Sequence, residues 1–239
     1  MRARAGAGWS GARAVQAGVL AAWAALFWTL LLTGRSALYL SPRTAWLVPI
    51  GALLLTAGAV GRLASARWGR SEPLGRREAW ALGVIALPVL VVLALPPATL
   101  TTYAASRRAS FLQAGFRTSP SEIASGSLTL IDVAGAQTSQ EGERALARRA
   151  GETVSFVGFV ARRPGTPADE FLLTRFIVSC CVADATIAQV RVVDAPPGRF
   201  GPDDWVRVTG RIYPLGREVI VEASSVVGVP RPARPYLTP

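Results

Sequence analysis

The stretch WVRVTGRIYPLGREVIVEASSVV, residues 205–227, decides the fold of this 239-residue chain. On either side of Leu215-Gly216, its small and apolar residues occupy every second position. These alternating positions are Val206, Val208, Gly210 and Ile212, followed by Val219, Val221 and Ala223. A period of two is typical of strands that bury one face, and a glycine marks the break between them. The stretch therefore predicts two half-buried strands, 205–213 and 218–227.

Three more strands are predicted upstream. They are TVSFVGFVAR (153–162), which is apolar on both faces, EFLLTRFIVS (170–179) and TIAQVRVVD (186–194). Breaks rich in proline and glycine separate the predicted strands. Five short strands suit a small closed or nearly closed barrel, so we expect an OB-like all-β domain over residues 128–229. A fragment of a β-sandwich is the alternative.

A helix is expected before the first strand. Many OB-folds carry a helix between strands three and four, but DAPPGRFGPDD (194–204) contains too much proline and glycine for one. By contrast, SQEGERALARRA (139–150) offers Ser139 as an N-cap, acidic residues in the first turn and arginines at its end. This pattern predicts a short helix, which we expect to close the bottom of the barrel.

The first hundred residues have a different character. Uncharged stretches occupy residues 14–34, 44–61 and 79–106. A helix needs about 20 mostly apolar residues to cross a bilayer core of about 30 Å. We therefore predict an all-α transmembrane region at 1–100, with three helices at about 14–34, 44–61 and 79–100. A cleaved signal peptide is a poorer interpretation of the first stretch, because its apolar run is too long and no small-x-small site follows it.

The distribution of charge predicts the orientation. All 26 basic residues are Arg, and the formal net charge is +11. Residues 1–100 carry ten Arg and two Glu, which gives +8, whereas residues 101–239 carry sixteen Arg and thirteen acids, which gives +3. The N-terminal segment, first loop and second loop hold three, two and five Arg. Because cytoplasmic loops are enriched in basic residues, the N-terminus is expected in the cytoplasm and the C-terminal domain outside it.

Two further segments complete the predicted organisation. Residues 101–127 are small and polar and are expected to form a tether, with a short helix around Ala104–Phe116. Residues 230–239 contain four prolines and are expected to form a tail.

The composition excludes several kinds of site. The chain has no His, which excludes Ser-His-Asp and Cys-His catalysis and any metal or haem held by His. Its two cysteines exclude a four-Cys zinc site within one chain and a scaffold with several disulfides. No glycine-rich loop that could hold phosphate is present, nor a nucleophile with its base, so we do not expect an enzyme.

The cysteine pair in RFIVSCCVADA (175–185) is the strongest candidate for chemistry. Cys180 and Cys181 could form a redox pair. A disulfide between them would be strained and readily reduced, and so a switch, because adjacent Cα atoms lie about 3.8 Å apart, below the usual disulfide range. The two thiolates and Asp184 could instead bind a soft metal such as Cu or Zn, with a second subunit completing the shell. Both thiols could also be structural. Asp184 could equally bond its own backbone in a turn, or pair with Arg175.

The same block carries a family resemblance. TRFIVSCCVADA (174–185), together with VSFVGFV and DDWVRVTGRI, resembles the YcgQ-like family of bacterial membrane proteins. YLSPR (39–43) and LPPATLTTYAA (95–105) also match phrases of this family. The resemblance implies a membrane subunit whose partner is a separate multi-span permease. It carries over to Arg175, Cys180, Cys181, Asp184 and Trp205.

Two functions are expected from these observations. The first is a non-enzymatic accessory subunit in the bacterial plasma membrane, whose barrel lies over the outer mouth of a permease. The predicted spans contain no charged residue, which disfavours this chain alone as a pore. The second is a membrane-tethered extracytoplasmic carrier of a metal or thiol that acts without a permease. Nucleic acid is not an expected partner, because the predicted topology places the barrel outside the cytoplasm.

Overall fold

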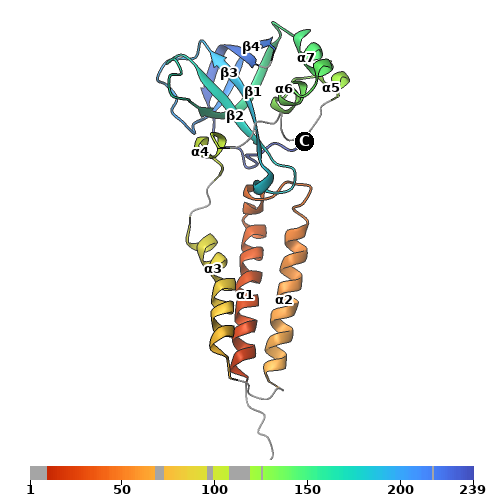
Figure 1. The fold of residues 1–239 in the computed structure, drawn as a ribbon, viewed down its shortest axis with the longest axis vertical. Helices are drawn as coiled ribbons and strands as arrows, with labels where there is room; N and C mark the ends of the chain where they lie inside the picture. Colours follow the sequence, from red (N-terminus) through yellow and green to blue (C-terminus); the bar gives the residue numbers. More distant parts are fainter. Residues whose placement is uncertain (1–9, 68–72, 96–98, 108–118, 125, 217) are drawn as a thin grey trace, which may run out of the picture. The chain divides into compact units, whose positions relative to one another are not determined.

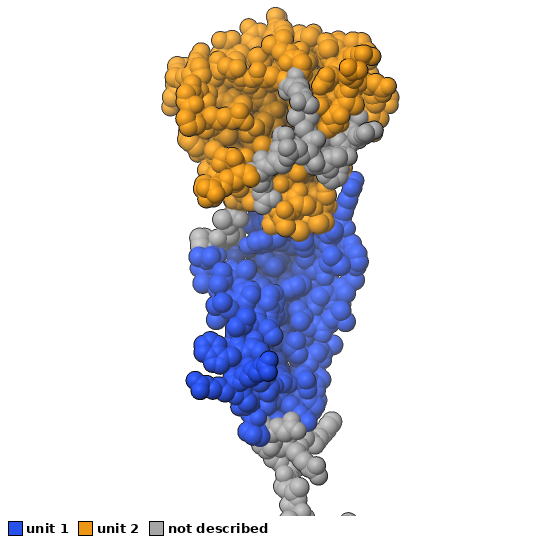
Figure 2. All heavy atoms as spheres, in the orientation of Figure 1, with its two compact units in different colours: residues 1–98 blue, residues 99–239 orange. Residues whose placement is uncertain are grey.

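The structure is a computed structural model that describes residues 10–67, 73–95, 99–107, 119–124, 126–216 and 218–239. The chain divides into two compact units, residues 1–98 and residues 99–239, which Figure 2 shows in different colours. The described part of the first unit is helical, and that of the second combines short helices with a β-barrel (Figure 1). This organisation confirms the predicted fold class.

Three long apolar helices form the first unit: α1 (Gly11–Leu32), α2 (Leu47–Ala66) and α3 (Arg76–Ala94). Each is long and apolar enough to cross a membrane. A short 3-10 helix, η1 (Arg35–Leu38), follows α1. Helix α3 ends six residues before its predicted end at residue 100. The cause lies in the sequence, because Pro96 and Pro97 follow and a residue before proline disfavours the helical region.

Small residues bring α1 and α2 together. A Cβ at Gly51 would lie 2.6 Å from the Phe27 ring, so glycine at this position lets the ring of α1 pack directly against the backbone of α2. The Trp28 indole N–H donates to the Thr56 hydroxyl at 3.2 Å. Helix α3 packs far less, and Val89 is its one buried residue. The result is a tight pair of helices and a third helix with most of its surface exposed.

A closed five-stranded barrel forms the centre of the second unit. Its strands are β1 (Thr153–Ala161), β2 (Phe171–Ile177), β3 (Thr186–Val193), β4 (Trp205–Leu215) and β5 (Glu218–Gly228). Their order around the barrel is β1-β2-β3-β5-β4, with β3 and β5 parallel and all other pairs antiparallel. The OB-like barrel predicted from the sequence is therefore confirmed, and the β-sandwich alternative is wrong.

Strand β1 pairs unequally with its two neighbours. Its register with β4 runs from Thr153 to Phe159, whereas its register with β2 covers only residues 159–161. At the point where the strands separate, a side chain at Gly158 would meet the carbonyl oxygen of Thr174 at 2.7 Å. The first half of β1 consequently has a strand on one side only among the described residues.

Short helices close one end of the barrel. They are α5 (Pro120–Ala124), α6 (Leu130–Ala136) and α7 (Gln140–Ala147), and they precede β1. Buried residues of all three belong to one hydrophobic core with the inward-facing strand residues. The Ser139 side chain accepts the N–H of Gly142, as its predicted N-cap role requires. No helix occurs between β3 and β4, in agreement with the proline-rich sequence there.

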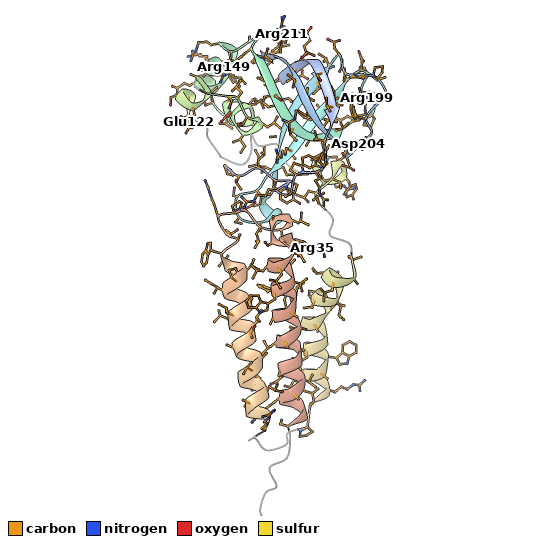
Figure 3. The ribbon with its side chains drawn as sticks, turned by 180° about the vertical axis from the view of Figure 1, so that it is seen from behind. Arg35, Glu122, Arg149, Arg199, Asp204 and Arg211 are labelled. Atoms are coloured by element: carbon orange, nitrogen blue, oxygen red, sulfur yellow. The ribbon has the colours of Figure 1, made fainter. Side chains whose placement is uncertain are left out.

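Arg149 fastens these helices to the barrel. Its guanidinium donates to the carbonyl oxygens of Ile123 and Gly126 at 2.9 and 2.8 Å. It also binds both carboxylate oxygens of Glu152 at 2.6 and 2.5 Å. Figure 3 labels Arg149 and Glu122 on the helical side of this unit. One side chain thus links the end of α5, the segment after α7 and the start of β1.

Candidate functional site at the β2–β3 turn

The turn between β2 and β3 is organised by the carboxylate of Asp184. One carboxylate oxygen accepts the N–H of Ser179 at 3.1 Å. The other accepts the N–H of Cys180 at 2.7 Å and that of Cys181 at 3.5 Å. Aspartate is suited to this role because its short side chain reaches backbone donors close in sequence. Asp184 therefore acts as a turn residue that binds its own backbone, one of the alternatives predicted from the sequence.

The two cysteines are thiols rather than a disulfide. Their Sγ atoms lie 3.7 Å apart, well beyond the disulfide bond length of about 2.05 Å. Cys180 is exposed, and Cys181 is half-buried. The Cys181 side chain also accepts the N–H of Asp184, so the two residues form a reciprocal capping box at the 3-10 helix η3 (Val182–Asp184). Cys181 thus occupies the N-cap position of η3, where Ser or Thr is usual.

Hydrogen bonding keeps the Cys180 thiol protonated. The side-chain hydrogen bond to Asp184 and then the one to Cys181 raise the pKa of Cys180 from 9.0 to about 11. Burial acts to raise the pKa of Asp184, but hydrogen bonds from the Cys180 thiol and from three backbone N–H groups lower it below its usual value. A protonated thiol is a weak nucleophile and a poor metal ligand, because the thiolate is the reactive form.

The residues of this turn fit a metal ion poorly. The carboxylate oxygens of Asp184 are already held by the backbone of residues 179–181. Within the described ranges, no group of three or more His, Cys, Asp or Glu residues is placed to hold a metal ion. The arrangement supports a structural role for the pair better than a Cu or Zn site.

Arg175 and Trp205 form a second cluster of predicted residues. The guanidinium carbon lies 5.7 Å from the centre of the Trp205 ring, within the range of a cation–π contact. The guanidinium donates to the carbonyl oxygens of Pro235 and Arg234, both at 3.0 Å. Burial lowers the pKa of Arg175. Arg175 therefore binds the C-terminal segment, and none of its hydrogen bonds here goes to Asp184.

The C-terminal segment, predicted only as a proline-rich tail, is bound to β2. Leu237 makes a parallel bridge with Ile177, with hydrogen bonds of 2.8 Å to the Phe176 carbonyl and 2.9 Å from the Val178 N–H. The Tyr236 ring packs edge-on against Phe176, with ring centres 6.4 Å apart. We call residues 230–239 the C-terminal strap.

The strap and the segment after α3 cover the outer side of β2. The N–H of Leu100 donates to the Tyr236 hydroxyl at 3.2 Å. Leu100, Tyr236 and Trp205 all pack on a second hydrophobic cluster around Phe159 and Phe176. OB-folds that bind oligonucleotides use the face of strands two and three. Part of that face is occupied here by the chain itself.

A known domain family matches the part of the chain that contains the short helices, the barrel and the C-terminal strap. Residues 121–238 match the DUF1980 C-terminal domain family. No curated protein matches the chain. The DUF1980 match starts within α5, includes the whole barrel and ends in the C-terminal strap, so it treats the strap and the helices as part of the domain. This family is uncharacterised, and the narrower YcgQ-like resemblance and its CCVADA motif stay predictions.

The structure separates the predicted site residues into two groups. Cys180, Cys181 and Asp184 share the β2–β3 turn, whereas Arg175 and Trp205 lie together under the strap. Sequence reasoning missed Tyr236 and Leu237, which hold the strap. The one available signal was this pair of large apolar residues in a segment that otherwise consists of proline, arginine and small residues.

Proposed function

We propose that this membrane protein is an accessory subunit of a permease complex, with its N-terminus in the cytoplasm and its barrel on the extracytoplasmic side. The main support is the exposed surface of α3. A groove of about 420 Å³ runs along this helix and is lined by Arg76, Ala79, Trp80, Gly83, Val84 and Leu87. Ala79 and Gly83 are one turn apart, and small residues at this spacing let a second membrane helix approach closely.

The polar side chains of the spans support an accessory role rather than a pore. The hydroxyls of Thr29, Thr33 and Thr56 donate to backbone carbonyls one turn earlier in their own helices. Gln16 donates to Glu78 at 2.5 Å. A transport path needs intramembrane polar groups that face a cavity. Here the threonine hydroxyls are bonded to the backbone of their own helices, and Gln16 links α1 to α3.

The geometry gives less support to a metal or thiol carrier. Such a carrier needs available thiolates. The Cys180 thiol is instead kept protonated by its hydrogen bond to the Asp184 carboxylate, which also accepts backbone N–H groups. Metal content of the full-length chain and of the Cys180→Ser/Cys181→Ser variant tests the carrier directly. Equal metal content in both proteins would remove it.

Purification of the tagged chain in mild detergent tests the accessory role. We expect a multi-span membrane protein to copurify in a constant ratio. Gly83→Leu should abolish this association, because Gly83 lines the groove and a Cβ there would have no atom of its own chain within 4 Å, which leaves the larger side chain to project into the groove. Gly18→Leu on α1 is the matched control, since a Cβ at Gly18 would also have no atom of this chain within 4 Å. A chain that purifies alone as a monomer would contradict the proposal.

A reporter fused to the C-terminus tests the orientation. Alkaline phosphatase is active only outside the cytoplasm, so we expect activity from a fusion after Pro239 and none from one in the loop between α2 and α3. The reverse pattern would place the barrel in the cytoplasm and exclude a position over the outer mouth.

A further inference from the structure

The first half of β1 offers backbone hydrogen-bonding groups that pair with no other strand in the described part of the chain. In the antiparallel ladder with β4, the carbonyl of Glu152 accepts from Ile212 and the N–H of Val160 donates to Asp204. The register between these residues has no shift. Alternate residues of a strand direct their backbone groups to opposite sides, so Thr153, Ser155 and Val157 direct theirs away from β4.

No described strand receives these groups. The register with β2 begins only at Phe159, and the end of β2 pairs with Leu237 instead. The C-terminal strap therefore occupies the edge that β2 would otherwise offer to β1. Among the described residues, the first half of β1 is left as an open strand edge, the kind of surface that recruits an additional strand.

A groove lies along this open edge. Its volume is about 560 Å³, and residues 153–157 form one wall. Leu237 of the strap and residues 127–130, which lead into the first turn of α6, also line it. Figure 1 shows the C-terminus close to α6. Thr153 and Ser155 are exposed on this strand, whereas Val154 and Phe156 are buried in the barrel core.

The charge in the groove selects the kind of partner. Two charged residues line it, Glu152 and Arg175. Glu152 is neutralised by Arg149, whereas the described part of the chain supplies Arg175 with two carbonyl oxygens and no carboxylate. A half-buried guanidinium without a carboxylate favours an anionic partner, because charge-assisted hydrogen bonds are about twice as strong as neutral ones.

We propose that the groove binds an extended acidic segment of a partner protein, which adds a strand to the open edge of β1 and places a carboxylate at Arg175. The main-chain groups of Thr153, Ser155 and Val157 supply the affinity, and Arg175 supplies the preference for acidic sequence. This site involves no residue of α3, so it stands or falls separately from the proposed contact with a permease.

Hydrogen exchange of the full-length chain in detergent is the first test. We expect the amides of Thr153, Ser155 and Val157 to exchange about a hundredfold faster than those of Val154, Phe156 and Gly158. Equal protection of both sets would show that the edge is closed and would overturn the proposal.

Peptide binding to the same full-length chain is the second test. The probe is a blocked seven-residue peptide that alternates Thr and Val around a central Glu, and its partner has Lys in place of Glu. We expect the Glu peptide to slow exchange at the three edge amides and to bind at least about fivefold more tightly than the Lys peptide. Arg175→Gln should remove this preference. No protection by either peptide, or equal binding of both, would refute the site.

Ser155→Pro separates edge pairing from general surface binding. It removes the N–H that faces the groove but leaves the backbone ladder to β4 intact, because the main-chain groups of Ser155 point away from β4. Both this variant and Ser155→Ala lose the 3.3 Å hydrogen bond between the hydroxyls of Ser155 and Thr209, so that loss does not distinguish them. We expect at least a tenfold loss of Glu-peptide affinity. Ser155→Ala keeps the N–H and should bind normally. Unchanged binding by a folded Ser155→Pro protein would contradict strand addition, and if that variant does not fold, the exchange pattern of the wild type still decides.

Discussion

The carboxylate of Asp184 accepts the backbone N–H of Cys180 at 2.7 Å and is also hydrogen-bonded by the thiol of the same residue. This double contact couples the two features that the sequence singled out in the β2–β3 turn. The carboxylate holds the backbone of the turn, and in doing so it keeps the adjacent thiol protonated. A negative group at this distance favours the neutral form of a thiol.

Asp184→Asn should therefore make Cys180 more reactive. Without the carboxylate, the pKa of Cys180 should fall from about 11 toward its ordinary value near 9.0. At pH 8 the thiolate fraction, and with it the rate of maleimide alkylation, should rise roughly ten- to a hundredfold. The measurement is made in a Cys181→Ser background, so that only the Cys180 thiol reacts with maleimide. Asp169→Asn, at an exposed residue before β2, is the control and should leave the rate unchanged.

The pH dependence of alkylation has a defined direction. In the unchanged turn the rate should still be rising between pH 9 and pH 11, because Cys180 titrates near 11. In Asp184→Asn the rise should be nearly complete by pH 10. Identical profiles in the two proteins would show that the carboxylate does not control the thiol.

Arg149→Ala should destabilise the second unit by about 1–3 kcal/mol, because it leaves the carbonyls of Ile123 and Gly126 without this donor and frees Glu152. Urea or thermal unfolding of the full-length chain measures this loss. Arg148→Ala changes the neighbouring exposed arginine and should have almost no effect. Equal stability of both variants would contradict the role of Arg149 as the link between helices and barrel.

Acid should weaken the same link. The hydrogen bond from Arg149 lowers the pKa of Glu152 below its usual value of 4.5, although burial opposes this shift. A carboxylate with a lowered pKa contributes stability above its ordinary pKa and loses it as the pH falls through the folded value. The difference in stability between wild type and Glu152→Gln should therefore be constant above about pH 5 and shrink below pH 4.

The barrel could be predicted because its sequence signals are local. Alternation at Val206, Val208 and Ile212 marks β4, and the breaks around 196–202 separate it from β3. The five predicted strands begin within one residue of the observed ones and end within two. Period-two patterns identify strands reliably when one face is buried and the other is polar. The three apolar helices carry an equally local signal, which is the length of their uncharged stretches.

The strap and the cluster under it could not be predicted, because they depend on contacts distant in sequence. Arg175 binds carbonyls about 60 residues further along the chain, and Leu100 binds Tyr236 across 136 residues. The Tyr236-Leu237 pair is the one local signal in ARPYLTP, and it does not indicate which strand the segment binds. The alternative in which Arg175 pairs with Asp184 is not observed, because Asp184 binds the backbone of its own turn and Arg175 binds the strap.

Removal of residues 236–239 should test how much the strap contributes. The truncation takes away the Tyr236 ring, the bridge of Leu237 to β2 and the cover over Phe176. We expect a loss of about 2–4 kcal/mol, which is typical of removing large packed side chains. Removal of Thr238 and Pro239 alone is the control and should change stability little. A truncated protein that unfolds like the wild type would show that the strap is only loosely associated.

Gly210→Ala should be the most damaging single change in the barrel. Gly210 is buried at the register shift between β4 and β5, and an added Cβ would collide with the carbonyl oxygen of Glu222. Because that atom is backbone, the two strands would have to separate. We expect a loss above about 2 kcal/mol, as for other overpacked core sites. Gly201→Ala is the control, since its Cβ would meet only the Asp204 carboxylate at 3.7 Å. If Gly210→Ala unfolds at the same urea concentration as Gly201→Ala, the bulge does not constrain the barrel.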